Sequence, residues 1–413
     1  MLGWRQRFPF ATTGGNRENM PSTSPPAPFP DGPLARITRI AAVLERAAAS
    51  NEELGRLTPE VVDHLHEARL FRLLLPRAYD GEEVDLPTWF CAMEALAKFD
   101  ASTAWCVGQI NGCAAAACAL APTVARTIWG DRRAALSWGP PVTARAEAVA
   151  GGHRLSGEWG MASGSRHASW LGLMAPIVDA SGKPEPQSDG MQLRTFLVPA
   201  GNVTFIDNWQ VHGLIATNSG GYSVRDLFVP HGYSVNRLQV LDSTLPSPLY
   251  KFPLNSFFSL GFSAVALGTA RSLLDAALAL AGEKRPRLAR LALRDNHAVQ
   301  LQIGEAEARL RSARGYVAAT AERVWAQTVA SGTLEVAQRM SIRMATTFAI
   351  HEAKAVADAA WEVAGANAIF ERGPFERRMR DIRTVTQQLQ GRKSHLQEVG
   401  GYLLGLEPNL MFA

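Results

Sequence analysis

The stretch HRLSGEWGMASGSRHASWLGLM, residues 153–174, decides how the rest of the chain is interpreted, because a mostly helical sequence changes to strand here. Leu155, Trp159 and Met161 alternate with small or polar neighbours, which is the period of a β-strand. The residues Ser163-Gly164-Ser165 favour a tight turn. A strand that ends in Ala-Ser-Gly can bring backbone amides and a hydroxyl close to a flat ligand. Taken alone, the pattern is more often an ordinary hairpin with a glycine turn.

More strand-like segments follow this stretch, at 195–199, 203–211 and 222–230, separated by Gly, Asn and Pro turns. Several short strands in this part of the chain predict a small β barrel or sandwich, which we place at residues 135–240. The fold class expected is therefore α+β and mainly α, because helical patterns lie on both sides.

The helical regions are predicted at residues 33–134, an N-terminal helical domain, and 241–413, a C-terminal four-helix bundle. Thr58-Pro59-Glu60 has the cap, first-turn proline and acidic residue of a helix start. In the C-terminal region, periodic segments continue to residue 364 with one break near Ser331-Gly332. Residues 1–32, rich in Pro, Gly, Ser and Thr, are expected to be a disordered leader.

The composition excludes several classes of function. A formal charge of +4 over 413 residues, without a basic tract that carries aromatics, gives no reason to expect nucleic-acid binding. The four cysteines have no paired CxxC spacing, so we expect reduced thiols and no metal site. No run reaches the roughly eighteen apolar residues of a membrane span, and no secretory signal is visible at the start. We expect a cytoplasmic protein with no membrane partner.

Trp159-Gly-Met-Ala-Ser163-Gly164 resembles a Trp-x-x-x-Ser-Gly segment of the acyl-CoA dehydrogenase superfamily. The similar branch is that of two-component flavin monooxygenases related to dibenzothiophene monooxygenase and p-hydroxyphenylacetate hydroxylase. There the segment lies against the isoalloxazine ring of the flavin. Resemblance continues through Trp209 to Ser219, the Arg380-Asp381 pair and a tail of the form Arg-Thr-x-Thr from Arg383, and it spans residues 34–405.

The resemblance implies two sets of site residues. The expected cofactor-binding residues are Trp138, Trp159, Ser163, Gly164, Arg271, Gly365, Asn367 and Thr384. The expected catalytic residues are Ser163, Gln388, Asn111 and His395. Arg271 is carried over as a contact to the flavin phosphate, and the glycine-rich break at Gly365 is one that often reaches a neighbouring subunit's cofactor.

Several of these assignments have an alternative. Gln109 and Asn111 follow the start of a central helix and either face the pocket or satisfy helix ends, with equal weight. Gln388 stands where the relatives have a histidine, and an amide cannot exchange a proton near neutral pH. Loss of a general acid or base commonly costs about a hundredfold to ten-thousandfold in rate. His395 or His212 could take that role, although a structural histidine is the more frequent case for both.

The function implied is that of an oxygenase component that uses reduced FMN or FAD and O2. It would oxygenate a small organic molecule through a hydroperoxide at flavin C4a. The sequence contains no Gly-x-Gly-x-x-Gly after a strand, so a separate NAD(P)H-dependent flavin reductase is the expected partner. A homotetramer, or at least a homodimer, is implied by the resemblance.

Two alternatives stay open. One is an acyl-CoA dehydrogenase-like flavin oxidoreductase. It is disfavoured because no carboxylate lies between Asp381 and Glu398, where much of the superfamily has its base. The other is a non-catalytic flavin-binding homologue, for which Gln388 is the best argument.

Overall fold

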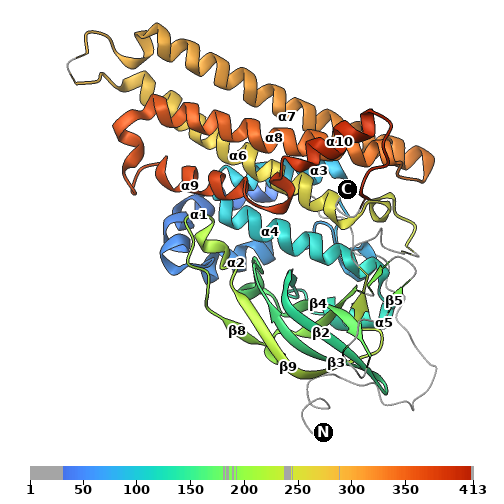
Figure 1. Ribbon diagram of the computed structural model, residues 1–413. Coiled ribbons are helices and arrows are strands. Elements are labelled where there is room, and N and C mark those ends of the chain that lie inside the picture. The colour runs from blue at the N-terminus through green and yellow to red at the C-terminus, as the bar shows by residue number, and fades with distance from the viewer. Residues whose placement is uncertain are drawn as a thin grey trace.

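The computed structural model describes residues 31–410, apart from 180–181, 183–185, 188–189, 192, 237–242, 244 and 288. Its helices and its sheet form layers, with α1 to α4 lying between the sheet and the long C-terminal helices (Figure 1). The predicted leader falls almost entirely outside the described residues. The prediction of a mainly helical fold with a central β region is confirmed.

The N-terminal region contains five helices among the described residues, joined by short turns. They are α1 (Pro33–Leu54), α2 (Pro59–Glu67), α3 (Leu86–Ala97), α4 (Ala101–Ala114) and α5 (Pro122–Trp129), with 3-10 turns η1 (Arg77–Tyr79) and η2 (Ala115–Ala119). The Thr58 side chain caps α2 as predicted, and Asp100 caps α4 by accepting from the Thr103 amide at 3.0 Å. α4 is buried on nearly every side. Its residues therefore contact the sheet, the other N-terminal helices and the C-terminal helices.

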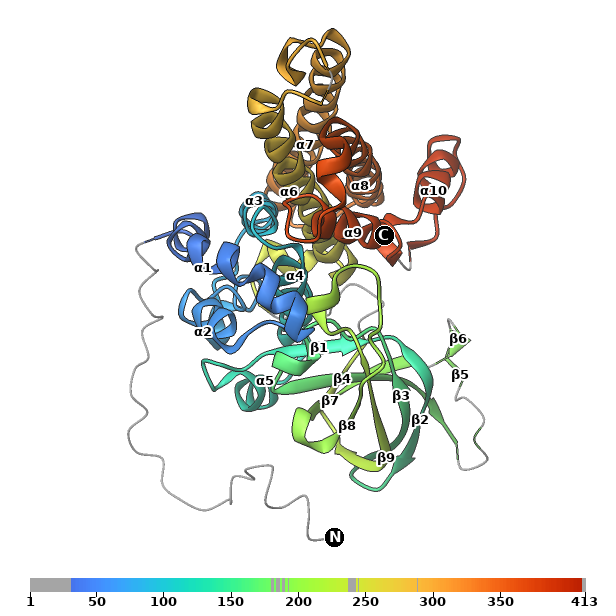
Figure 2. The same ribbon diagram turned by 90° about the vertical axis from the view of Figure 1, so that its left-hand side faces the viewer.

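The central region is one eight-stranded mixed sheet of order β10-β7-β4-β2-β3-β9-β8, with β1 paired to β4. Its strands are β1 (Leu136–Gly139), β2 (Pro141–Val149), β3 (Gly152–Trp159), β4 (Trp170–Val178), β7 (Leu193–Pro199), β8 (Thr204–Ile206), β9 (Gly221–Pro230) and β10 (Ser234–Val235). A separate small hairpin joins β5 (Pro186–Gln187) and β6 (Gly190–Met191). β1 and β2 run parallel to β4, while the other pairs are antiparallel. Figure 2 shows this sheet as a curved layer below the N-terminal helices.

One predicted strand is too long. The segment 203–211 forms a strand only over β8, which ends at Ile206. After it, the Asn208 side chain accepts from the Gly221 amide at 2.9 Å, so a side chain takes over the contact to β9. The chain then leaves the sheet and turns toward the helices, which brings the next residues to the candidate site.

The C-terminal region is built from three long helices and two short ones. The long helices are α6 (Leu254–Glu283), α7 (His297–Ser331) and α8 (Val336–Ala364), and the short ones are α9 (Glu376–Val385) and α10 (Ser394–Leu403). The turns between them are η7 (Leu293–Asp295), η8 (Gly365–Ile369) and η9 (Leu389–Gly391). The predicted break is the left-handed Gly332, with φ of 72°. The C-terminal region is helical as predicted, and α3 of the N-terminal region also packs against α6 and α7.

The helix α6 is the apolar centre of the fold. Its 30 residues reach a mean hydropathy of 1.4 in an 18-residue window, so by length and composition it could cross a membrane, contrary to the sequence-based expectation. In the structure 61% of that window is buried against other helices. Close packing explains its small residues: at Gly261 an added Cβ would lie 3.0 Å from the Trp89 ring of α3. Trp89 also donates its indole N–H to the Phe257 carbonyl at 3.0 Å, which fixes α3 on α6.

Candidate flavin site

The turn after β3 places the Ser163 hydroxyl among three elements of the fold. Trp105 of α4 donates its indole N–H to Ser163 Oγ at 2.9 Å, and Ser219 Oγ lies 2.6 Å from the same atom. On β1, the Ser137 hydroxyl donates to the Ser163 carbonyl at 2.7 Å. Ser163 is only 6% exposed, so its side chain has a fixed position. A short turn of the sheet is thereby tied to α4.

The second half of this arrangement is the turn η5 (Ile215–Thr217), which follows the shortened β8 strand. Thr217 Oγ1 lies 2.6 Å from Ser219 Oγ and donates to the Leu214 carbonyl at 2.7 Å. The Thr217 carbonyl in turn accepts from the amide of Gly164, whose φ is 72°. Glycine suits that left-handed conformation, because a side chain there is strained. The two turns therefore hold each other through both backbone and hydroxyl contacts.

The hydroxyl groups of Thr217, Ser219 and Ser163 each have one proton to donate. If each hydrogen bond among them contains one proton, only one arrangement of donors and acceptors is possible. A carbonyl only accepts, so Thr217 must donate to the Leu214 carbonyl. Ser219 then donates to Thr217, and Ser163 donates to Ser219. Because Ser163 has given its single proton away and already accepts from Trp105, it can only accept toward any further group. We call these three residues, Ser163, Ser219 and Thr217, the hydroxyl chain.

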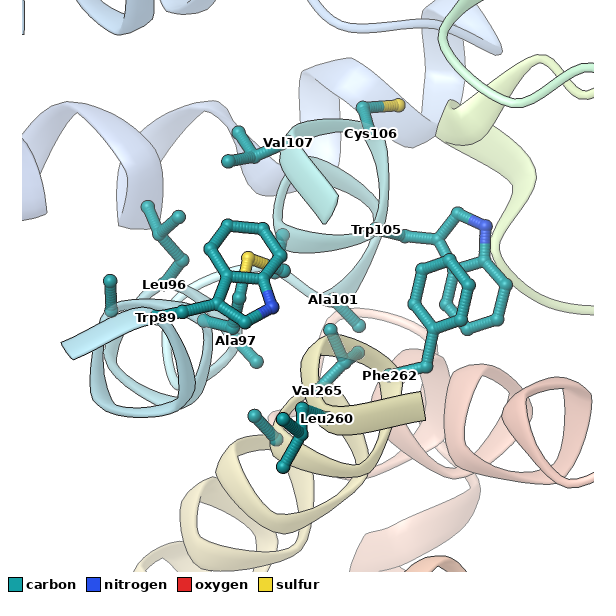
Figure 3. Packing of buried hydrophobic residues seen from close by; sticks show 14 of the residues in the cluster. Trp89, Leu96, Ala97, Ala101, Trp105, Cys106, Val107, Leu260, Phe262 and Val265 are labelled. Carbon is teal, nitrogen blue, oxygen red and sulfur yellow. The ribbon is translucent and has the colours of Figure 1, made fainter. Parts of the chain in front are cut away.

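An aromatic stack forms the wall beside the hydroxyl chain. The rings of Trp105 and Phe262 lie 3.8 Å apart between centroids and are tilted by only 8° (Figure 3). Phe262 belongs to α6, so the stack joins the N-terminal and C-terminal helices directly behind Ser163. Trp105 and Phe262 are 7% and 5% exposed, respectively, which keeps water away from one side of the hydroxyl chain.

A buried carboxyl group supports η5 from the other side. Asp381 of α9 accepts from the Leu214 amide at 2.7 Å and is 2% exposed. Burial raises the pKa of Asp381 to about 7; the Leu214 amide lowers it and nearby Asp100 raises it further. Leu214 has φ of 53°, an uncommon value for a residue with a side chain. Asp381 therefore helps to hold a strained turn whose carbonyl receives the end of the hydroxyl chain.

The Asp381→Asn variant is expected to remove a pH dependence of stability. A carboxyl with a raised native pKa binds protons more tightly when folded, so it destabilises the native state as pH rises from about 4 to about 7. Relative to the variant, the wild type should lose roughly 2 to 4 kcal/mol of unfolding free energy between pH 5 and pH 8. Urea unfolding of both proteins across this range measures that difference.

The comparison between the two proteins is necessary because buried histidines titrate in the opposite sense. Burial lowers the pKa of His66, His167 and His395 to about 4 each, so they reduce stability as pH falls below their usual pKa. Both proteins share that effect. An equal loss of stability in wild type and Asp381→Asn as pH rises would contradict the assignment of Asp381.

Two predicted site residues, Trp159 and Asn111, are fully buried. Trp159 is fully buried, donates to the Met174 carbonyl at 2.8 Å and stacks on Tyr222 inside the sheet. Asn111 is also fully buried; it accepts from the Leu74 amide at 3.1 Å, and its amide group donates to the carbonyls of Leu70 and Val107. Of the alternatives weighed for Asn111, its contacts match the structural one. The aromatic residue that contacts the Ser163 side chain is Trp105.

Trp138 and Thr384 lie close to the described contacts. Trp138 is buried in β1 and its carbonyl accepts from the side chain of Gln109 at 2.9 Å. Thr384 of α9 donates to the Arg380 carbonyl at 3.0 Å and faces Gly213. A Cβ at Gly213 would lie 2.6 Å from the Thr384 hydroxyl oxygen, so α9 packs tightly on the residues before η5.

Three other predicted residues pair elsewhere in the chain. Arg271 forms ion pairs with Asp275 at 2.7 Å and Glu307 at 2.5 Å. Gly365 begins η8 at the far end of α8, and Asn367 accepts from the Lys284 ammonium group at 2.5 Å. None of these contacts reaches the hydroxyl chain within one chain.

The tail contains the remaining predicted residues. Gln388 Oε1 accepts from the Gln390 amide at 2.7 Å, while its Nε2 is buried and has no hydrogen-bond partner. His395 of α10 is 6% exposed, and its pKa is lowered to about 4 by burial first and by Arg343 second. It is therefore neutral near pH 7. His212 is exposed, and its carbonyl accepts from Arg380 at 2.8 Å.

The roles of Trp105, Thr217 and Asp381 have no direct sign in the sequence, although Thr217 and Asp381 lie in segments used for the resemblance. Which partner each of these residues donates to or accepts from can be seen only in the three-dimensional structure. In the part of the chain that the structure describes, no cluster of His, Cys, Asp or Glu could hold a metal ion, and the four cysteines are free thiols.

Comparison with known proteins places this geometry in a family. The model for the acyl-CoA dehydrogenase N-terminal domain matches residues 38–123, and that for the C-terminal domain matches residues 260–390. The chain belongs to the acyl-CoA dehydrogenase superfamily. The two matched regions flank the sheet in the sequence, and they cover most of the N-terminal helices and most of the C-terminal helices.

Within the superfamily, the similar proteins are monooxygenases. Indole-3-acetate monooxygenase of Pseudomonas putida is 28% identical over 357 residues, which is 85% of this chain and 88% of that protein. The flavin-dependent monooxygenase oxygenase subunit HsaA of Rhodococcus jostii is 27% identical, covering 84% of this chain and 91% of its own length. Among solved structures, XiaF from Streptomyces in complex with FADH2 and glycerol has a TM-score of 0.85 at 24% identity, covering 91% and 96% of the two chains.

Proposed function

We propose that this protein is the oxygenase component of a two-component flavin monooxygenase. It takes reduced FMN or FAD from a separate NAD(P)H-dependent flavin reductase and uses O2 to oxygenate a small organic molecule. The observation that carries the proposal is the hydroxyl chain, which leaves Ser163 as a pure hydrogen-bond acceptor beside an aromatic wall. The monooxygenase relatives, which align along most of their length, support it.

The residues present fit a reduced flavin better than an oxidised one. Reduced flavin has an N–H donor at N5, whereas oxidised flavin has an acceptor at the same atom. An acceptor-only Ser163 therefore suits the reduced form. When bound, the reduced flavin would supply the two electrons that activate O2, of which one oxygen atom is transferred to the substrate and the other is released as water. Ser163 would orient the ring, and the stack of Trp105 and Phe262 would keep water from its edge.

The tail offers a hydrogen bond where relatives have a histidine. The unpartnered Nε2 of Gln388 can donate to an oxygen atom in the site, but it cannot release a proton near neutral pH. Any proton transfer would then come from another group of the chain, from the substrate or from water. No carboxylate lies between Asp381 and Glu398, which disfavours the dehydrogenase alternative.

The proposal is tested by mixing the protein anaerobically with chemically reduced FMN or FAD and then adding O2. We expect a transient phase in which the absorption spectrum matches neither reduced nor oxidised flavin. This phase should last longer with the protein than with free flavin. Gln388→Ala should shorten that phase, since it removes the unpartnered donor. The exposed Gln387, one residue earlier, provides a matched control in Gln387→Ala, which should leave the phase unchanged.

Two outcomes would contradict the proposal. Direct return to oxidised flavin with release of hydrogen peroxide would favour a non-catalytic flavin-binding homologue. Bleaching of tightly bound oxidised flavin by an acyl-CoA would favour the dehydrogenase alternative.

We also propose that the protein is a homotetramer or homodimer and works in the cytoplasm. Large apolar side chains are exposed on α8, η8 and the end of the chain, where α10 projects from the long helices (Figure 2). They are Phe348, Ile369, Phe370, Leu396, Leu403, Leu404 and Leu406. A second chain would also explain why Arg271 and Asn367 do not reach Ser163 of their own chain. Light scattering measures the mass directly, and a monomer at micromolar concentration would contradict this part of the proposal.

A further inference from the structure

Gln109 is the one residue of α4 that the rest of the fold leaves accessible. Of the 14 residues of this helix, 13 are buried and Gln109 is half-buried. The polar atoms of a side chain in such a place need partners, either from the protein or from a molecule outside the core. A ligand that approaches α4 from outside therefore meets Gln109.

The orientation of the Gln109 amide follows from its neighbours. Its Nε2 donates to the Trp138 carbonyl of β1 at 2.9 Å and lies 3.4 Å from Cys113 Sγ, one turn further along α4. The reverse orientation would place Oε1 against the Trp138 carbonyl, and neither of these two atoms has a proton to donate. Among the described residues, Oε1 accepts no hydrogen bond, and it is not fully buried. Gln109 thus holds a hydrogen-bond acceptor in a fixed position and leaves it available.

Asn111, two residues later, has the contacts of a structural amide on the same helix. Its oxygen accepts from the Leu74 amide, and its nitrogen donates to the carbonyls of Leu70 and Val107. Both polar atoms of Asn111 are therefore satisfied inside the core. Gln109 differs, because only its nitrogen has partners.

Gln109 lies one helical turn from the residue that contacts the hydroxyl chain. Trp105, four residues earlier, donates to Ser163 Oγ, and the Cβ atoms of residues four apart on a helix are about 6 Å from each other. A second connection runs through β1. Trp138, which accepts from Gln109, follows Ser137, whose hydroxyl donates to the Ser163 carbonyl. Gln109 and the hydroxyl chain therefore belong to the same part of the molecule.

The side chains of α6 that pack on this part of α4 are aromatic. A Cβ at Gly108 would lie 3.2 Å from the Phe262 ring, and a Cβ at Gly112 would lie 2.3 Å from the Phe258 ring. The two rings stack on each other with centroids 5.8 Å apart. A flat apolar molecule suits such rings, and a donor on its edge would find an acceptor at Gln109.

We propose that Gln109 is a specificity-determining residue whose Oε1 accepts a hydrogen bond from an O–H or N–H group of the substrate. The inference rests on the proposed function, because it takes the bound molecule to be the one that is oxygenated. The class of substrate selected is a flat, largely apolar molecule with at least one hydrogen-bond donor. Gln109 takes no part in the oxygen chemistry.

The test compares compounds that differ only in the donor. Phenol is paired with anisole, and indole with 1-methylindole, and each is titrated into the full-length protein by calorimetry, with and without reduced flavin and always without oxygen. In at least one pair, we expect the compound with the donor to bind about 10-fold more tightly than its methylated counterpart. Gln109→Met keeps the length of the side chain but removes the acceptor, so it should lower that ratio about 10-fold. The bulk of the added methyl group acts on wild type and variant alike.

A purely structural role of Gln109 predicts a different result. Loss of the bond to the Trp138 carbonyl would weaken both members of a pair to the same extent and leave their ratio unchanged. Gln109→Leu is a second variant without an acceptor and should give the same fall in the ratio. The matched control is Gln302→Met, which changes a half-buried glutamine of α7 that donates to Glu362 at 2.6 Å. It should change neither the affinities nor their ratio.

Two results would overturn the proposal. One is a ratio that stays the same in wild type and in both Gln109 variants. The other is the absence of a preference for the donor in both pairs with wild type, which includes failure of all four compounds to bind at millimolar concentration. Because no oxygen is present, these titrations do not depend on oxygenation. Failure of the proposed monooxygenase activity is detected separately, when O2 is added to the protein with reduced flavin.

Discussion

Thr217→Val should weaken the binding of reduced flavin relative to oxidised flavin by about 10- to 100-fold. This loss is expected when two hydrogen-bond donors face each other at a buried site. Valine has the same shape but no hydroxyl, so the proton of Ser219 loses its acceptor. Ser219 can then donate to Ser163, which frees the Ser163 proton to point toward the ligand. A donor at Ser163 opposes the N–H of reduced flavin and suits the bare N5 of oxidised flavin.

Anaerobic titration with each flavin form measures the two dissociation constants, and their ratio also predicts a shift in the midpoint potential of the bound flavin. Thr217→Ser is the matched control, because it keeps the hydroxyl and should keep the preference. If the ratio for Thr217→Val equalled that of the wild type, Ser163 would not be held as an acceptor by this chain. The result is independent of oxygenation, since no oxygen is present.

The Gly213→Ala variant should cause the largest loss of stability among simple substitutions at this site. An added Cβ would lie 2.2 Å from the Arg380 carbonyl oxygen and 2.4 Å from its carbon, which are backbone atoms of α9. Such atoms cannot rotate away, so α9 and the turn at Leu214 must separate. We expect a loss of about 3 kcal/mol in unfolding free energy. Urea unfolding at one fixed pH measures it.

A glycine with free space around it supplies the control. Gly304 lies within α7, and a Cβ there would meet no atom within 4 Å. Gly304→Ala should therefore raise stability by about 1 kcal/mol through helix propensity alone. Neutral surface changes scatter by roughly 0.5 kcal/mol in unfolding free energy. If the two variants differed by less than about 0.5 kcal/mol, α9 would not pack on Gly213 as described.

The hydroxyl chain and Asp381 together explain how a strained turn is kept in place. Leu214 and Asn218, at the two ends of η5, both have positive φ, 53° and 41°. The Leu214 amide donates to Asp381, and the Asn218 side chain donates to the Gly55 carbonyl at 2.8 Å. The strain is thus offset by contacts to α9 and to the end of α1, two elements far away in the chain.

The local features of the protein could be predicted from its sequence alone. The period-2 pattern before Ser163 gave the strand, Thr58 gave a helix cap, and Gly332 gave the end of α7. These features depend on neighbours within a few residues, so periodicity and turn chemistry are sufficient to predict them. The resemblance then indicated the order of the domains along the chain.

Which of these residues contact one another depends on how distant parts of the chain pack together. Trp105 and Ser163 are 58 residues apart, and Ser163 and Ser219 are 56 apart, so no local pattern links their hydrogen bonds. Trp159, in the more conspicuous position, turned out to fill the sheet core. Arg343 looked like any helical arginine until packing buried it. The effect of a charge or of a hydrogen-bond donor depends on its burial and on its partners. Burial and partners are set only when distant elements pack together.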